Sequence, residues 1–178
     1  MKNTLASVQA IANQTARRAA SLPEFTEAFT GRLVALSKAH DALSNTGWLA
    51  VDLRALVEQI CGAAGDESRF RLDGPAVALP TRVALTLGLI LHELCTNASK
   101  YGALLHNGRV RVSWSVTVQN QLVLDWVESG GPAVKPPQKN GFGTGFIRRS
   151  IEAELGGTIA FDFLPDGLAV HAEIPLVA

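Results

Sequence analysis

The sequence contains few of the residues that mark several large classes of protein. Only two of its 178 residues are cysteines, Cys61 and Cys95, and they have no paired spacing. A small disulfide-stabilised secreted domain is therefore excluded, and we expect two buried, reduced thiols in a cytoplasmic protein. The four histidines are scattered, and none stands at a zinc-binding spacing from a cysteine or another histidine.

Net charge and long apolar runs are also lacking. Lysine plus arginine number 16 and aspartate plus glutamate number 16, so the net charge is zero. This balance argues against broad binding to nucleic acid or to an anionic membrane surface. The longest strongly apolar stretch, 83–91, is interrupted by Thr86 and Gly88 and is too short to span a bilayer. The N-terminus lacks the apolar region of a signal peptide. We therefore expect a segment without nucleic-acid or membrane contacts.

Apolar residues are abundant enough for a sizeable core, at 47% of the chain. Their periodicity predicts helices over 2–20 and 24–44, separated by a short break that contains Pro23. A connection this short folds two helices back as an antiparallel hairpin. One narrow hairpin cannot bury both apolar seams, so pairing with a second copy in a four-helix bundle is favoured. Packing of the hairpin on the downstream part of the chain is the alternative. The seam predicted for the second helix is Phe25, Phe29, Leu33, Leu36, His40 and Leu43.

The rest of the chain alternates between helical and strand patterns. This order predicts an α+β fold, with helices layered over a sheet that is mainly antiparallel. A glycine at position 47 is typical of a helix end. It places the boundary between a hairpin domain, 1–47, and a second domain, 48–178. Helices are expected over 51–64, 80–104 and 144–155, and strands within 68–79 and over 109–118, 121–129, 158–163 and 168–175.

Three polar residues recur along the helix expected at 80–104. Glu93, Asn97 and Lys100 are spaced by four and three, so they share one helical stripe. The amide oxygen of Asn97 suits a hard cation such as Mg²⁺, and Lys100 suits a phosphate. Glu93 suits the positioning or deprotonation of an attacking group, or the binding of a metal-bound water. The competing interpretation is a solvated helix face with ordinary charges.

Two glycine-rich segments follow the stripe. Glu128 ends a strand and is followed by Gly130 and Gly131, which suits a carboxylate that accepts from an exocyclic amine beside a flat ring. The segment GFGTG, 141–145, directly precedes an expected helix, where backbone N–H groups favour phosphate. It matches neither the Walker nor the Rossmann pattern. A strand end beside a turn and a glycine-rich helix cap are the simpler interpretations. The loop 130–141 is long enough to be functional or mobile.

The order of these segments resembles the HWE class of sensor histidine kinases, within the Bergerat-fold ATPases. That class is named for a histidine in its first box and a Trp-x-Glu in its second, and this sequence has His92 and Trp126-Val127-Glu128. The stretch GFGTGFIRRSIEAELGG is similar to the family's glycine box and following helix. The stretches KNTLASVQAIANQT and RLVALSKAHDAL are similar to its two dimerisation helices. The resemblance therefore extends over essentially the whole chain.

The resemblance implies a dimerising helical hairpin followed by a Bergerat-type α/β sandwich that binds ATP and Mg²⁺. Asn97 would ligate Mg²⁺, and Glu93 would polarise the acceptor or order the metal shell. His92 would be catalytic beside Glu93, or equally a buried structural histidine, and Trp126 would pack. The implied nucleotide-binding residues are Asn97, Lys100, Tyr101, Glu128, Gly130, Gly131, Gly141, Gly143 and Thr144.

The sequence departs from the family pattern at two places. The family's phosphoacceptor lies in a motif similar to His-Arg-Val-Lys-Asn-Thr-Leu, and Met1 occupies its valine position, so the histidine would fall two residues earlier. Either the sequence starts inside a longer protein, or the natural protein lacks the acceptor; in both cases we expect no autophosphorylation at the usual position. Gly145 stands where many relatives carry arginine, which is expected to weaken a phosphate or lid contact.

The resemblance implies the ATP-binding kinase core of a two-component histidine kinase. Such a core transfers the γ-phosphoryl group to a histidine and onward to the receiver domain of a response regulator, and it works as a homodimer joined through its N-terminal helices. A non-catalytic dimeric adaptor, or a phosphotransfer-like protein that has retained the fold, is the alternative. Loss of nucleotide binding would favour that alternative.

Overall fold

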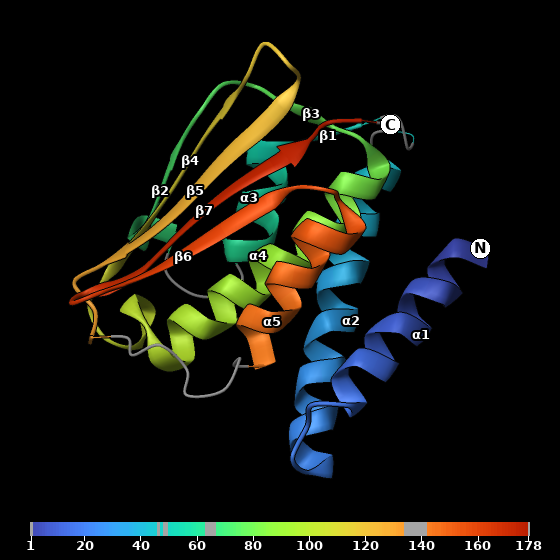
Figure 1. The fold of residues 1–178 in the computed structure, drawn as a ribbon, viewed down its shortest axis with the longest axis horizontal. Coiled ribbons are helices and arrows are strands. Elements are labelled where there is room, and N and C mark those ends of the chain that lie inside the picture. The colour runs from blue at the N-terminus through green and yellow to red at the C-terminus, as the bar shows by residue number, and fades with distance from the viewer. Residues whose placement is uncertain (1, 46, 48–49, 63–66, 134–141, 178) are drawn as a thin grey trace.

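The computed structural model describes residues 2–45, 47, 50–62, 67–133 and 142–177. A helical hairpin is followed by a layer of helices that covers one side of a twisted sheet (Figure 1). This arrangement confirms the predicted α+β fold.

The hairpin consists of α1 (Lys2–Ala16) and α2 (Leu22–Asn45). Helix α1 ends earlier than the predicted limit of residue 20, and α2 begins two residues before the predicted residue 24. The start of α2 has a local cause. Ser21 Oγ accepts a hydrogen bond from the Glu24 backbone N–H at 3.3 Å, and the Glu24 carboxylate accepts from Ala20 N–H at 2.8 Å. This pair resembles a capping box displaced by one residue.

The buried face of α2 differs from the predicted seam. Leu36 and Leu43 are buried as expected, but the other four seam residues are only partly buried. The correction arises because α2 packs against α4 (Thr81–Tyr101) of the same chain, as the predicted alternative describes (Figure 1). Dimerisation remains a prediction. The residues of α2 that are buried are Arg32, Ala35, Leu36, Ala39 and Leu43.

The main sheet has five strands in the order β2-β4-β5-β7-β6. Strand β2 runs parallel to β4, and the other neighbours are antiparallel, which confirms the predicted bias. Asn120, with a φ of 58°, forms the predicted tight turn between β4 and β5. A separate pair joins β1 (Val51–Asp52) to β3 (Ala78–Leu79). The strands of the main sheet are β2 (Phe70–Asp73), β4 (Arg109–Val116), β5 (Gln121–Ser129), β6 (Thr158–Leu164) and β7 (Gly167–Pro175).

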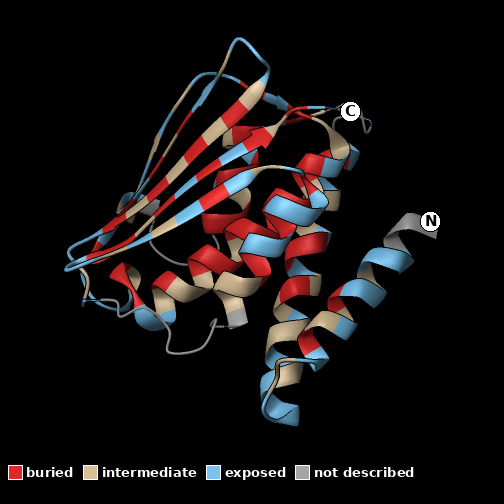
Figure 2. Cartoon of the chain, in the orientation of Figure 1, coloured by how far each residue is buried: buried red, intermediate tan, exposed pale blue. Residues whose placement is uncertain are grey.

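Period-two patterning places one face of the sheet against the helices. Alternate residues along β5 are buried, from Leu122 to Glu128, and form part of the interior seen in Figure 2. Helix α3 begins after Asp52, whose Oδ1 accepts the Ala55 N–H at 3.1 Å, two residues later than the predicted start at 51. The remaining helical elements are α3 (Leu53–Cys61), η2 (Glu67–Arg69), η3 (Ala103–Leu105), α5 (Phe142–Arg149) and the π-helical turn η4 (Ser150–Glu154).

Candidate functional site

The polar stripe of α4 meets the start of α5. A β-carbon placed on Gly143 would lie 2.7 Å from Asn97 Nδ2 and 3.1 Å from Asn97 Oδ1, so only glycine fits there without a shift. Helix α5 begins at Phe142 rather than at the predicted residue 144. Gly143, Thr144 and Gly145 therefore belong to its first turns instead of preceding it. Two segments predicted separately, whose residues Asn97 and Gly143 are 46 positions apart, thus lie in direct contact.

Glu128 lies at the end of β5, beneath the turn that follows α4. Its side chain is only 2% exposed. Oε2 accepts the Ala103 N–H at 2.9 Å, Oε1 accepts the Trp126 indole N–H at 3.2 Å, and the Leu168 backbone makes a further hydrogen bond. Burial raises the pKa of the Glu128 carboxyl, and these three hydrogen bonds oppose that rise. A carboxylate has about four acceptor positions, so about one remains for a ligand amine.

The glycines beside Glu128 allow close backbone packing. Gly130 has a φ of +69°, a left-handed conformation that favours glycine. A β-carbon on Gly131 would lie 2.6 Å from the Ala103 Cα, and one on Gly102 would lie 2.1 Å from Glu128 Oε2. The sequence predicted Gly130 and Gly131 as backbone elements of the site, whereas Gly102 was missed. Its position directly after the polar helix was the signal available.

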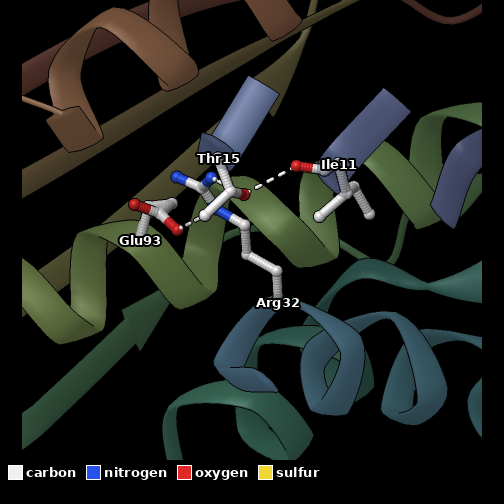
Figure 3. Close-up of polar contacts among 4 residues, drawn as sticks. All are labelled: Ile11, Thr15, Arg32 and Glu93. Carbon is white, nitrogen blue, oxygen red and sulfur yellow. Dashed lines mark hydrogen bonds and ion pairs between the residues drawn. The ribbon is translucent and has the colours of Figure 1, made fainter. Parts of the chain in front are cut away.

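Glu93 is held by a buried arginine from the hairpin. Its Oε1 lies 2.8 Å from Arg32 Nε, and the two residues are 7% and 1% exposed. Arg32 Nη1 donates to Thr15 Oγ1 at 2.8 Å, and that hydroxyl donates to the Ile11 carbonyl at 2.6 Å (Figure 3). The chain of contacts therefore joins α4, α2 and α1.

The partner of Glu93 was not predicted. Arg32 falls on the face of α2 that buries Leu36 and Leu43, at helical spacing from both. From the sequence alone, a single arginine in such a position is expected to be exposed to solvent, because no partner for its charge is apparent. That partner, Glu93, lies 61 residues away in sequence.

Lys100 and Tyr101 lie at the exposed end of α4. Lys100 forms an ion pair with Glu27 of α2, and the hydrogen bond to Glu27 raises the pKa of the Lys100 ammonium. Tyr101 is 66% exposed. The structure thus places Lys100 on the same helix as Asn97 but directs its ammonium toward the hairpin.

His92 lies on the side of α4 that packs against α2. A β-carbon on Gly31 would lie 2.8 Å from His92 Nε2, so the imidazole rests directly on the backbone of α2. Burial lowers the pKa of His92, and the nearby cations Arg32, Lys38 and Lys100 lower it further, while Glu93 opposes them. His92 lines a cavity of about 330 Å³ together with Lys38, Cys95, Ser99 and Lys100. Its catalytic role remains a prediction.

Of the remaining predicted residues, the structure describes Thr144 and Gly145 but not Gly141. Thr144 is half-buried in the first turn of α5, near Gly143. Arg18 lies against Gly145, since a β-carbon there would meet its Nη1 at 2.1 Å. Gly141 and most of the predicted loop 130–141 lie outside the described residues.

The helical hairpin, the mixed sheet and the Asn-bearing helix beside a glycine-rich helix start form the arrangement that the resemblance to histidine kinase cores predicts. Residues 1–76 match the family model for "HWE histidine kinase". A blue-light-activated histidine kinase of Brucella anthropi is 39% identical over 183 residues, which cover 99% of this chain and 37% of the relative. The Brucella ovis protein of the same description is 34% identical over 185 residues, covering 98% and 37%. The chain therefore belongs to the HWE histidine kinases, and it spans about a third of the length of these relatives.

A solved structure extends the comparison to the fold. The blue-light activated histidine kinase of Erythrobacter litoralis EL346 superposes with a TM-score of 0.73 at 21% identity, covering 98% of this chain and 59% of that one. Among the residues that the structure describes, no helix is both long and apolar enough to cross a membrane.

Proposed function

We propose that this chain is the ATP-binding kinase core of a two-component histidine kinase, which transfers the γ-phosphoryl group of ATP to a histidine. The observation that carries the proposal is the contact between Asn97 and Gly143. It brings an amide suited to Mg²⁺ close to a helix start suited to phosphate. The family membership supports the same reaction.

The residues present fit Mg·ATP. The amide oxygen of Asn97 is a hard ligand suited to Mg²⁺, and it lies beside Gly143 in the first turn of α5, where backbone N–H groups suit phosphate. When bound, Mg·ATP supplies the phosphoryl group, and its metal neutralises phosphate charge. Glu128 would accept the base amine between the backbones of Gly130 and Gly131.

Other residues complete the proposed site. Lys100, Tyr101, Thr144 and Gly141 would border the nucleotide, with the Lys100 ammonium turning from Glu27 toward phosphate. Glu93 would orient the acceptor imidazole and take its proton, and we retain His92 beside it as the second catalytic candidate.

The partners follow from the same proposal. A homodimer would form through the exposed side of the hairpin, where Leu5, Leu22 and Val34 are exposed. The receiver domain of a response regulator would take the phosphoryl group from the histidine. Because the relatives are named for activation by blue light, a light-sensing domain is the input we propose for the full-length protein. The cytoplasm is the compartment in which we propose that it acts.

The test places a histidine at the position of the family's phosphoacceptor. A variant with His-Arg placed before Met1 is incubated with Mg²⁺ and γ-labelled ATP, and a matched variant carries Ala-Arg. We expect acid-labile label on the first variant and none on the second. ATP binding without label on the His-Arg variant would contradict the kinase proposal. Absence of nucleotide binding in both would favour the adaptor alternative.

A further inference from the structure

Arg32 occupies the junction between the hairpin and the second domain. It is 1% exposed, and its guanidinium contacts three other helices. Nε bonds to Glu93 of α4, and Nη1 donates to Thr15 of α1, as Figure 3 shows. Its Cζ also lies 4.2 Å from the ring centroid of Phe146 in α5. One side chain on α2 therefore links α1, α4 and α5.

Both partners of Arg32 in the second domain adjoin the proposed nucleotide site. Glu93 precedes Asn97 by one helical turn on the same stripe of α4. Phe146 lies one turn after Gly143 in α5. Helices α4 and α5 thus meet directly at Asn97 and Gly143. One turn away along each helix, Arg32 of α2 contacts both Glu93 of α4 and Phe146 of α5.

We propose that Arg32 is a positioning residue that couples nucleotide binding to helix α1 through its hydrogen bond to Thr15. This inference rests on the proposed function. Nucleotide that contacts both Asn97 and the start of α5 fixes the spacing of α4 and α5, and therefore the positions of Glu93 and Phe146. Arg32 is expected to move with both partners, because a buried guanidinium that lost either contact would lose part of the compensation for its desolvation. Thr15 then transmits the change to α1, the helix whose family counterpart presents the acceptor.

The geometry of arginine suits this role. A guanidinium offers several donors in a fixed planar fork, so the bonds to Glu93 and Thr15 constrain each other. The flat face remains available for Phe146. A lysine ammonium lacks the planar fork and its stacking face. The exposed pair between Lys100 and Glu27 also links α4 to α2, but solvent competes for it.

The test measures amide hydrogen exchange of residues 5–16 in the whole chain, with and without Mg·ATP. Thr15→Val removes the hydroxyl with little change of shape, and Arg32→Lys keeps the charge but not the fork. Thr26→Val is the matched control, because Thr26 Oγ1 makes the same type of bond to the Leu22 carbonyl at 2.9 Å but is exposed. Nucleotide affinity is measured by calorimetry on the same samples.

In the wild type and in Thr26→Val, Mg·ATP is expected to slow exchange in α1 by about fivefold or more, a typical size for coupling between two sites. In Thr15→Val and Arg32→Lys the slowing is lost while the nucleotide Kd stays that of the wild type, an outcome that purely structural damage would not produce. Equal slowing in all four chains, or no slowing in a wild type that binds Mg·ATP, overturns the coupling and leaves the proposed function standing. A wild type that does not bind Mg·ATP overturns both.

Discussion

The backbone of Gly143 lies against the side-chain amide of Asn97, so a β-carbon at Gly143 would come within 2.7 Å of the amide nitrogen. This contact joins α4, which carries the polar stripe, to α5, which carries the glycine box. It is the geometric basis of the nucleotide site that we propose for this chain.

The close approach at Gly143 makes a direct prediction. Gly143→Ala is expected to push α5 away from Asn97 and to reduce the thermal stabilisation given by Mg·ATP. Gly145→Ala is the matched control in the same helix, since its β-carbon meets only the end of the flexible Arg18 side chain. Differential scanning fluorimetry with and without Mg·ATP compares the two. An equal nucleotide response in both variants would count against the contact.

Trp126 is expected to act through Glu128 rather than on a ligand. Trp126→Phe removes the indole N–H that Glu128 Oε1 accepts and leaves a buried carboxylate short of a donor. The free energy of unfolding should fall by about 1–3 kcal/mol for that bond, with a further loss from the smaller ring. Urea unfolding measures it.

Trp114→Phe is the control for this substitution, because Trp114 donates to the uncharged carbonyl of Pro75 at 2.8 Å. Its cost should be nearer to about 1 kcal/mol for the lost bond. Mg·ATP binding by folded Trp126→Phe should persist. If Trp126→Phe kept full stability but lost nucleotide affinity, a direct role for the indole would replace this interpretation.

Two ion pairs between α2 and α4 should contribute very different amounts to the free energy of unfolding. Arg32→Met leaves the buried Glu93 carboxylate without its cation and is expected to cost about 3–5 kcal/mol. Lys100→Ala breaks an exposed pair with Glu27 and is expected to cost about 0–1 kcal/mol. Chemical denaturation of both variants gives the comparison. Similar small losses would mean that Arg32 and Glu93 are not paired as described.

His92 should make stability depend on pH below neutrality. Its pKa in the folded chain lies below the ordinary value of 6.5, because burial disfavours the charged imidazole. The stability it contributes is therefore present above pH 6.5 and is lost as the pH falls through the lowered pKa. His92→Gln should flatten the loss of unfolding free energy on acidification from about pH 7 to pH 5.

His171 provides the opposite control for this titration. A hydrogen bond to Asp125 raises the pKa of His171, so its contribution is present below pH 6.5 and is lost as the pH rises through the raised pKa. His171→Gln should steepen the loss on acidification. If His92→Gln left the slope unchanged, the imidazole of His92 would not be buried as described.

Local patterns predicted much of the fold. The alternation along 121–129 and the turn at Asn120 follow from period-two patterning and turn chemistry, which need no knowledge of distant residues. The buried face of α2 did not follow, because an amphipathic helix shows that it packs but not against what. Packing on α4 buries Ala35 and Ala39, and it leaves Phe25 and Phe29 partly exposed and stacked, with centroids 5.4 Å apart.

The candidate site, too, was predicted where motifs identify residues and missed where tertiary packing decides. The family motifs predicted Asn97 and Gly143, and the structure brings them together. Arg32 was missed because a buried charge is favourable only with a partner, and its partner Glu93 comes from a remote helix. The ammonium of Lys100 was assigned to phosphate from its stripe and from the family resemblance, whereas tertiary packing pairs it with Glu27.

The central claim is that Asn97 and the start of α5 form a site for Mg·ATP. Calorimetric titration of ATP into the wild type and Asn97→Ala, each with Mg²⁺ and with a chelator, tests it most directly. The account predicts that the wild type binds ATP more tightly with Mg²⁺, and that Asn97→Ala loses this metal dependence together with the thermal stabilisation by Mg·ATP. Metal-dependent binding that is unchanged in Asn97→Ala would contradict the account.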